Sequence, residues 1–170
     1  MVFAQQENII LIGMPGAGKS TLGILLAKAI GYDFIDTDLL IQRQAGMTLG
    51  RYLADRGYQA LRQLEAEVIC ALDHAGTVIA TGGSAVYSQA AMQHLRANGR
   101  VVYLQCALEV LDQRIASMDE RGIAAPSGQT LADVQAERIP IYEQFAEITV
   151  GVGSENMDST LGKIIRHLNL

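Results

Sequence analysis

Residues 13–21 read Gly-Met-Pro-Gly-Ala-Gly-Lys-Ser-Thr, the spacing of a phosphate-binding loop. Glycines let successive backbone N–H groups converge on one anion, and a helix that starts here points its positive end at the same phosphates. A glycine-rich turn that binds nothing is the alternative, but an apolar run at 8–12 and a helical pattern at 21–30 flank the loop as a phosphate site requires. We therefore expect a nucleoside triphosphate to bind Gly13, Gly16, Ala17, Gly18, Lys19, Ser20 and Thr21.

Strand-like and helix-like segments alternate along the rest of the chain. The strand candidates are short, apolar and without clean alternation, as in a parallel sheet covered on both faces. They lie at 9–12, 33–35, 77–80, 101–104 and 148–150, and helices are expected at 19–30, 39–45, 48–56, 58–74, 88–97, 108–117, 130–145 and 159–168. The pattern predicts a three-layer α/β fold in which helices flank a five-stranded parallel sheet.

Acidic residues and a glycine pair follow two of the expected strands. Ligands of such folds bind at the carboxyl ends of the strands, where Asp36, Asp38 and the pair Gly82-Gly83 fall. One carboxylate there can hold Mg²⁺ through water and a second can accept the proton of an attacking hydroxyl. Aspartate is also common here as a helix cap. Two glycines at a strand end let a ligand approach the backbone closely.

Two arginines indicate an anionic second substrate. Arg62 and Glu65 share one face of a predicted helix, so the glutamate could aim the guanidinium. Arg138 lies in a later helix. Each is also compatible with an ordinary surface residue. Together with Asp38 they suit a hydroxylated carboxylic acid, because arginine binds carboxylates through two parallel hydrogen bonds.

The stretch from Met118 to Gln129 differs from the helices on either side. It holds small, polar and turn-forming residues. A plain surface loop and a lid that closes over the nucleotide are both compatible with this composition. Arg121 within the stretch favours the second, a mobile lid at about 118–128.

The composition limits the partners. A chain of 170 residues suits one domain, and a net charge of −5 without a basic run argues against a nucleic-acid partner. No apolar run reaches about 18 residues and no signal peptide is visible, so we expect no membrane partner. Cys70 and Cys106 lack metal-ligand spacing and are expected to be buried thiols in a reducing cytosol. We expect a cytoplasmic monomer.

Over nearly its whole length the chain resembles the shikimate kinase family of P-loop enzymes. The shared features are GMPGAGKST, FIDTD at 34–38, AGMT at 45–48, the Arg-x-x-Glu of 62–65, ATGG at 80–83, the lid arginine and the R-x-P-x-Y phrase of 138–142. The resemblance implies a fold similar to that of adenylate kinase, with five parallel strands and a lid. It also implies a single domain over 1–170, whose helical region at about 38–65 binds the substrate.

The resemblance further implies ATP- and Mg²⁺-dependent phosphorylation of the 3-hydroxyl of shikimate. Each matched residue then has an implied role. Lys19, Asp38 and Arg121 would be catalytic, Arg114 would stack on the adenine, Ser20 and Asp36 would hold the metal, and Asp38, Arg62, Gly82, Gly83 and Arg138 would bind the substrate.

Several positions depart from the family pattern. Ser84 stands where a third glycine is usual, Gly122-Ile123-Ala124 replaces Pro-Leu-Leu after the lid arginine, Leu53 and Leu61 replace phenylalanines, and Tyr58 replaces a glutamate. Three of these changes fall in the expected acceptor pocket, whereas the phosphoryl-transfer residues are intact. The sequence therefore predicts a kinase that acts on shikimate. The alternatives are a kinase of the same fold for another hydroxylated carboxylic acid, and an inactive relative that only binds nucleotide.

Overall fold

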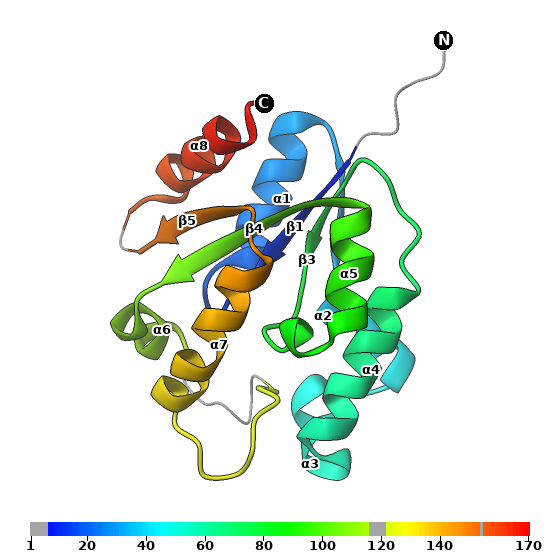
Figure 1. The fold of residues 1–170 in the computed structure, drawn as a ribbon. Coiled ribbons are helices and arrows are strands. Elements are labelled where there is room, and N and C mark those ends of the chain that lie inside the picture. Colours follow the sequence, from blue (N-terminus) through cyan, green and yellow to red (C-terminus); the bar gives the residue numbers. More distant parts are fainter. Residues whose placement is uncertain (1–6, 116–121, 154) are drawn as a thin grey trace.

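A single parallel sheet forms the centre of the computed structural model, which describes residues 7–115, 122–153 and 155–170 (Figure 1). In these residues five strands lie in the order β2-β3-β1-β4-β5, and every neighbouring pair is parallel. The strands are β1 (Asn8–Ile12), β2 (Asp33–Asp36), β3 (Thr77–Ala80), β4 (Gly99–Cys106) and β5 (Ile148–Val152). The predicted five-stranded parallel sheet is thus confirmed, with β4 longer at both ends than its apolar run suggested.

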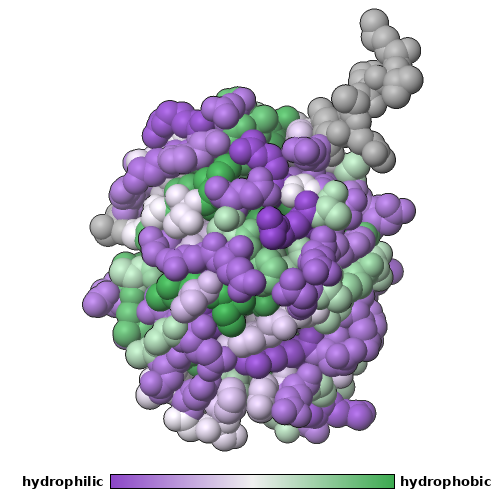
Figure 2. Space-filling model, viewed as in Figure 1, coloured by the Kyte–Doolittle hydropathy of each residue, from purple (hydrophilic) through white to green (hydrophobic). Residues whose placement is uncertain are grey.

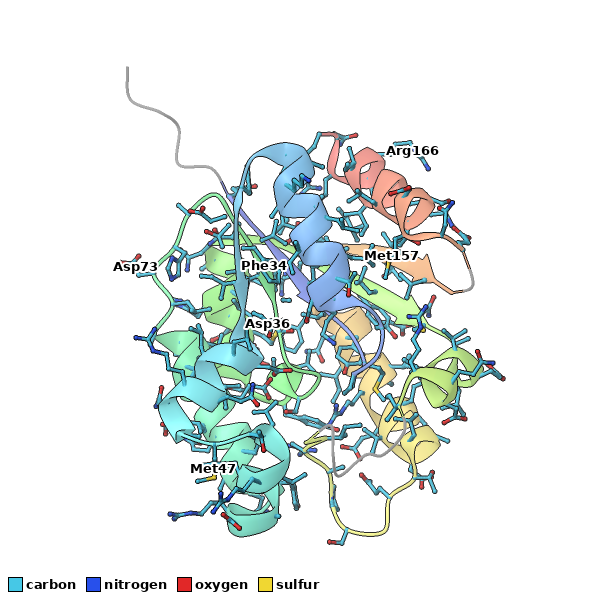
Figure 3. The ribbon with its side chains drawn as sticks, turned by 180° about the vertical axis from the view of Figure 1, so that it is seen from behind. Phe34, Asp36, Met47, Asp73, Met157 and Arg166 are labelled. Carbon is cyan, nitrogen blue, oxygen red and sulfur yellow. The ribbon has the colours of Figure 1, made fainter. Side chains whose placement is uncertain are left out.

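Helices cover both faces of this sheet, which gives the predicted three layers (Figures 1 and 3). One face carries α1 (Lys19–Ile30) and α8 (Met157–Leu168), and the other carries α5 (Gln89–Ala97) and α7 (Leu131–Phe145). The remaining helices of the described residues are α2 (Thr37–Ala45), α3 (Leu49–Arg56), α4 (Tyr58–Cys70), the short 3₁₀ helix η1 (Ala85–Tyr87) and α6 (Leu108–Arg114).

The core is built around β1, the central strand. All five of its residues are buried, because helices cover both faces, and this explains the continuous apolar run without alternation. Its polar member, Asn8, is satisfied by hydrogen bonds. Asn8 Nδ2 donates to the carbonyl oxygen of His74 at 2.6 Å, and Asn8 Oδ1 accepts from the N–H of Thr77 at 3.0 Å. These bonds fix the loop that leads into β3.

Three sequence expectations are wrong: two concern the ends of helices and one concerns the burial of a cysteine. The helix expected at 58–74 ends at Cys70, where the N–H of Leu72 bonds three residues back to the carbonyl of Ile69, and the carbonyl of His74 accepts from Asn8. The helix expected at 108–117 ends at Arg114, where Ile115 takes extended backbone angles (φ −107°, ψ 100°). Cys106 is buried as expected, but Cys70 is exposed at the end of its helix.

The surface is mostly hydrophilic in the view of Figure 2, with smaller apolar areas between the polar ones. The large hydrophobic side chains that stay exposed come from different elements: Ile24, Leu39, Met157 and Leu170. Over the described ranges, no helix is both long and apolar enough to cross a membrane.

Candidate active site

The phosphate-binding loop connects β1 to α1, and two of its glycines are needed for its shape. Gly18 caps α1 with a left-handed backbone (φ 95°, ψ 16°), a conformation that other residues rarely adopt. A Cβ on Gly13 would lie 2.7 Å from the carbonyl oxygen of Leu104. Gly18 offers no side-chain cap to α1. The first N–H groups of the helix therefore face the loop, as at anion sites.

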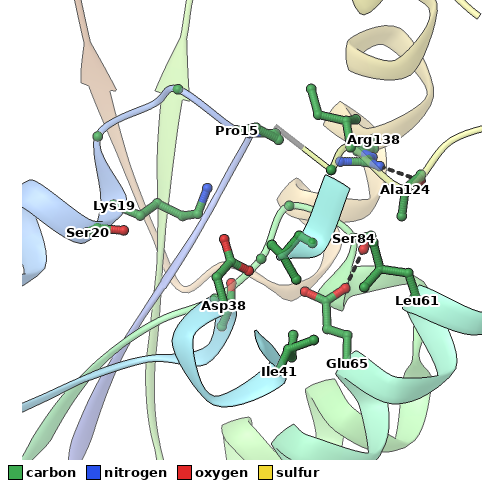
Figure 4. Close-up of a pocket in the computed structure, with 18 of the residues that line it drawn as sticks. Pro15, Lys19, Ser20, Asp38, Ile41, Leu61, Glu65, Ser84, Ala124 and Arg138 are labelled. Carbon is green, nitrogen blue, oxygen red and sulfur yellow. Dashed lines mark hydrogen bonds between the residues drawn. The ribbon is translucent and has the colours of Figure 1, made fainter. Parts of the chain in front are cut away.

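Lys19 places a buried positive charge beside this loop. Its Nζ donates hydrogen bonds of 2.8 Å to the carbonyl oxygens of both Gly13 and Met14. Burial lowers the pKa of Lys19 to about 8, against the opposing attraction of Asp38. In Figure 4 the ammonium group and the Asp38 carboxylate both point into one cavity. The charge thus lies where the transferred phosphate is expected.

Ser20 and Asp36 form the candidate metal site. Ser20 Oγ donates to Asp36 Oδ2 at 2.5 Å, and Asp36 ends β2 in front of α2 (Figure 3). A hydroxyl and a carboxylate are hard oxygen ligands, the kind that Mg²⁺ takes together with water and phosphate oxygens. The residues therefore fit this ion. Asp36 also caps α2, since its Oδ1 accepts from the N–H of Asp38 at 3.0 Å. The metal and capping interpretations are compatible.

Asp38 lines the cavity from the first turn of α2. Burial raises its pKa, Asp36 adds to the rise, and Lys19 opposes it. A carboxylate with a raised pKa is a stronger base, which suits a group that accepts the proton of a hydroxyl.

Gly82 and Gly83 follow β3 and leave space that side chains would fill. A Cβ on Gly82 would overlap Glu65 Oε1, and a Cβ on Gly83 would lie 2.8 Å from Arg138 Nη1. The N–H of Gly82 donates to Thr37 Oγ1 at 3.1 Å. The N–H of Gly82 is therefore already engaged within the protein, and the main contribution of Gly82 to the site is space.

The two predicted carboxylate-binding arginines meet at one backbone oxygen. Arg138 Nη2 donates to the carbonyl oxygen of Ala124 at 2.9 Å (Figure 4). Arg62 donates to the same oxygen through Nε at 3.2 Å and Nη2 at 2.9 Å. Arg138 is buried and lines the cavity, while Arg62 is half-buried behind it. The two guanidinium groups thus act on a single acceptor atom.

The expected pairing of Arg62 with Glu65 is wrong. Glu65 Oε2 accepts a hydrogen bond from Ser84 Oγ (Figure 4), and Glu65 Oε1 has no hydrogen-bond partner among the described residues. Burial raises the pKa of Glu65 to about 7, and the Ser84 hydrogen bond opposes the rise. Sequence analysis thus missed a buried carboxylate in the cavity wall. The available signal was Ser84, which puts a hydroxyl donor where the family usually has glycine.

Arg114 connects the phosphate loop to the segment after β5. Its Nη1 donates to the carbonyl oxygen of Gly16 and its Nη2 to that of Gly153, both at 3.1 Å. It also lines the cavity. This position agrees with a nucleotide-binding residue, and its stacking on adenine stays a prediction.

The predicted lid is described only in part. Arg121, its proposed catalytic residue, lies outside the described residues. Ile123 and Ala124 are buried and line the cavity, and a Cβ on Gly122 would lie 2.5 Å from Leu49 Cβ. This part of the segment therefore packs against α3.

One cavity of about 480 Å³ brings most of the predicted site together. Of the predicted residues, those that line it are Gly16, Gly18, Lys19, Ser20, Thr21, Asp38, Gly82, Gly83, Arg114 and Arg138; Gly13, Ala17, Asp36 and Arg62 do not. Leu61 lines it too, whereas Leu53 packs in a cluster around Ile41 and Leu64. Of the two leucines that replace phenylalanines, only Leu61 therefore shapes the cavity wall directly.

Comparisons with known proteins agree with this geometry. A family model for shikimate kinase matches residues 15–169. The chain is 37% identical to shikimate kinase 2 of Yersinia pseudotuberculosis (strain YPIII) over 145 residues, which cover 82% of this chain and 83% of that relative. It is 36% identical to the shikimate kinase of Methylococcus capsulatus over 163 residues, which cover 94% and 91%.

Solved structures give the same result for the fold. A shikimate kinase from Acinetobacter baumannii in complex with shikimate has a TM-score of 0.88 and 30% identity, over 96% of this chain and 93% of that one. The shikimate kinase of Aquifex aeolicus has a TM-score of 0.81 and 28% identity, over 95% and 96%. The predicted α/β P-loop kinase fold is thus confirmed over nearly the full length.

Proposed function

The chain belongs to the shikimate kinase family, and from this premise we propose that it transfers the γ-phosphoryl group of ATP to the 3-hydroxyl of shikimate. The product is shikimate 3-phosphate, an intermediate of aromatic amino acid biosynthesis. One observation carries the proposal: Lys19, Asp38 and Arg138 line the same cavity (Figure 4). The cavity therefore combines a phosphate-binding loop, a basic carboxylate and a carboxylate-binding arginine.

Arg62 and Arg138 bind and orient the acceptor in this proposal. Their guanidinium groups are fixed donors that match the two oxygens of a carboxylate. Holding the carboxylate at this end of the cavity directs the ring hydroxyls of the acceptor toward Asp38. Gly82 and Gly83 have no side chain to fill the cavity, so the ring can approach the backbone closely.

Asp38 accepts the proton of the attacking hydroxyl, and Lys19 neutralises charge on the transferred phosphoryl group. Catalysis is mostly positioning and charge neutralisation, as for other phosphoryl transfers. Arg121 adds a second positive charge from the lid at 118–128, and closure of the lid excludes water as a competing acceptor.

Mg²⁺ is the proposed metal, and when bound it supplies charge neutralisation at the phosphate oxygens. Ser20 Oγ would hold it directly and Asp36 through water. The support for this assignment is the short contact of 2.5 Å between Ser20 Oγ and Asp36 Oδ2 beside the phosphate loop.

We also propose that residues 1–170 form a single domain that acts as a cytoplasmic monomer, without a nucleic-acid or membrane partner. The helical region at 38–65 binds the acceptor in this proposal. Asp38 at the start of the region and Glu65 at its end both line the cavity, which supports this assignment. The net charge of −5 supports the absence of a nucleic-acid partner.

The first test is ADP release from Mg-ATP with and without millimolar shikimate. A rate that depends strongly on shikimate is expected. ATP binding without stimulation by shikimate would contradict shikimate as the acceptor. Nucleotide binding without turnover on any acceptor would instead indicate an inactive relative.

A different hydroxylated carboxylic acid is the second candidate acceptor. The observation that favours it is the cavity wall itself, where Leu61 and Ser84 both line the space and differ from the usual phenylalanine and glycine. Screening such acids in the same ADP assay separates the two acceptors, because the better one has the higher kcat/KM.

A further inference from the structure

Tyr87, the last residue of η1, contacts both acceptor-binding arginines. The Cζ of Arg62 lies 3.6 Å from the centre of the Tyr87 ring, and the Cζ of Arg138 lies 5.4 Å from it. Arg62 also lies 5.0 Å from the ring of Tyr58. A guanidinium within about 6 Å of an aromatic face is attracted by the ring. The two guanidinium groups that donate to the carbonyl oxygen of Ala124 therefore both contact the ring of Tyr87.

This support does not cancel the charge of the arginines. Ion pairs in the described residues involve Arg51, Arg100 and Lys163, and neither Arg62 nor Arg138 forms one there. Two neighbouring guanidinium groups that form no ion pair repel each other. An aromatic face stabilises them and leaves the N–H edges able to donate. The positive charge stays available to an incoming carboxylate.

The hydroxyl of Tyr87 binds the carboxylate of Glu137, which could otherwise cancel this charge. It donates to Glu137 Oε1 at 2.5 Å, and Gln129 Nε2 donates to Glu137 Oε2 at 3.2 Å. The hydrogen bond from Tyr87 is the main cause that lowers the pKa of Glu137, with Gln129 and the two arginines adding to it. Glu137 is thus ionised next to the arginines but bound to neutral donors.

We propose that Tyr87 is a positioning residue for acceptor recognition, whose ring supports Arg62 and Arg138 and whose hydroxyl retains Glu137, so that both guanidinium groups serve the acceptor carboxylate. The inference rests on the proposed function and extends it. Tyr87 acts through the arginines and is absent from the cavity lining among the described residues.

The experiment separates the ring from the hydroxyl. Tyr87→Leu removes both, Tyr87→Phe keeps the ring, and Tyr87→Phe combined with Glu137→Gln removes the carboxylate that Tyr87→Phe would release. Tyr32→Leu and Tyr32→Phe are matched controls, since Tyr32 lies before β2, at the amino ends of the strands, whereas η1 follows β3 at the carboxyl ends. For each variant we would measure kcat, the KM for ATP, the KM for shikimate and the KM for its neutral carboxamide.

Tyr87→Leu is expected to raise the KM for shikimate about tenfold, the range of a partly buried cation–π contact. Its KM for ATP should stay within about twofold of the wild type, and its KM for the carboxamide should hardly change. Tyr87→Phe should raise the KM for shikimate by less, about threefold. Adding Glu137→Gln should return that value toward the wild type.

An unchanged KM for shikimate in Tyr87→Leu would overturn the inference, as would an equal rise for shikimate and the carboxamide. Failure of the proposed function has a different signature, a wild-type protein without shikimate-dependent ADP release. In that case calorimetric binding of shikimate decides the inference. A tenfold loss of affinity in Tyr87→Leu supports it, whereas equal affinities, or no binding at all, overturn it.

Discussion

The Ser84 hydroxyl donates a hydrogen bond to the Glu65 carboxylate in the cavity wall, while Arg62 on the same helix donates to the carbonyl oxygen of Ala124. Ser84 and Glu65 are both buried. A glycine, which the family usually has at this position, would offer no donor. The aromatic rings of Tyr58 and Tyr87 support Arg62 instead. Glu65 and Arg62 therefore have separate partners, although helix spacing would allow them to pair.

Replacing Glu65 by Gln should alter the pH dependence of stability. Burial raises the pKa of Glu65 from 4.5 to about 7, so between these values the folded chain keeps a proton that the unfolded chain has released. The free energy of unfolding of the wild type therefore falls as the pH rises through this window. Relative to Glu65→Gln the fall should be on the order of 3 kcal/mol. Urea unfolding from pH 4.5 to 7.5 measures it, and parallel curves for the two proteins would contradict the raised pKa.

Lys19→Ala should lower turnover by at least ~100-fold, in the range of a lost charge-stabilising group. The ammonium group is held beside the phosphate loop by the carbonyls of Gly13 and Met14, and alanine leaves no charge there. Steady-state ADP release measures the effect. Lys28→Ala is the control, because this exposed lysine lies on the same helix. Near-normal turnover in Lys19→Ala would refute the catalytic role.

Arg62→Ala should raise the KM for the acceptor by about 10- to 100-fold, the cost of a charge-assisted hydrogen bond, and leave the KM for ATP nearly constant. Arg56→Ala, an exposed position one helix earlier, is the control. If the KM for ATP rose while the KM for the acceptor stayed normal, the acceptor end of the cavity would be misassigned.

Gly83→Ala should disturb both the nucleotide-binding end and the acceptor-binding end of the cavity. The added Cβ would lie 2.7 Å from Pro15 Cδ in the phosphate loop and 2.8 Å from Arg138 Nη1. Overpacking of this kind costs roughly 1–3 kcal/mol, or a few degrees in Tm. Both KM values should rise and Tm should fall, as kinetics and calorimetry would measure. Gly151→Ala is the control, since its Cβ meets nothing within 4 Å; identical behaviour of the two variants would disprove the steric argument.

Structural features that depend only on residues close together in the sequence were predictable. The phosphate loop, β1 and α1 follow from one continuous segment in which glycine spacing and apolar runs act locally. The carboxyl-end position of Asp38 and of Gly82 followed from the strand order of α/β folds. The ends of α4 and α6 did not follow, because their C-caps are Ala71 and Ile115, neither of which is a residue type that marks a helix end.

Partner choice in the acceptor wall was not predictable either. Glu65 and Arg62 are three residues apart, and helix spacing favours their pairing. Ser84 lies 19 residues from Glu65, and Ala124 lies 62 residues from Arg62. Only the packed fold brings these groups together, and buried contacts outweigh a local pairing of modest strength.

The carbonyl oxygen of Ala124 acts as an internal reference ligand for the two arginines. An acceptor that binds the same N–H groups exchanges one oxygen for another, and the gain in free energy is the difference between two sets of hydrogen bonds. A carboxylate gains from the exchange because both partners of the new bonds are charged, whereas the carbonyl of Ala124 is neutral. A neutral sugar or polyol would replace a neutral oxygen by its equal. The carbonyl oxygen of Ala124 thus favours charged acceptors over neutral acceptors of the same shape.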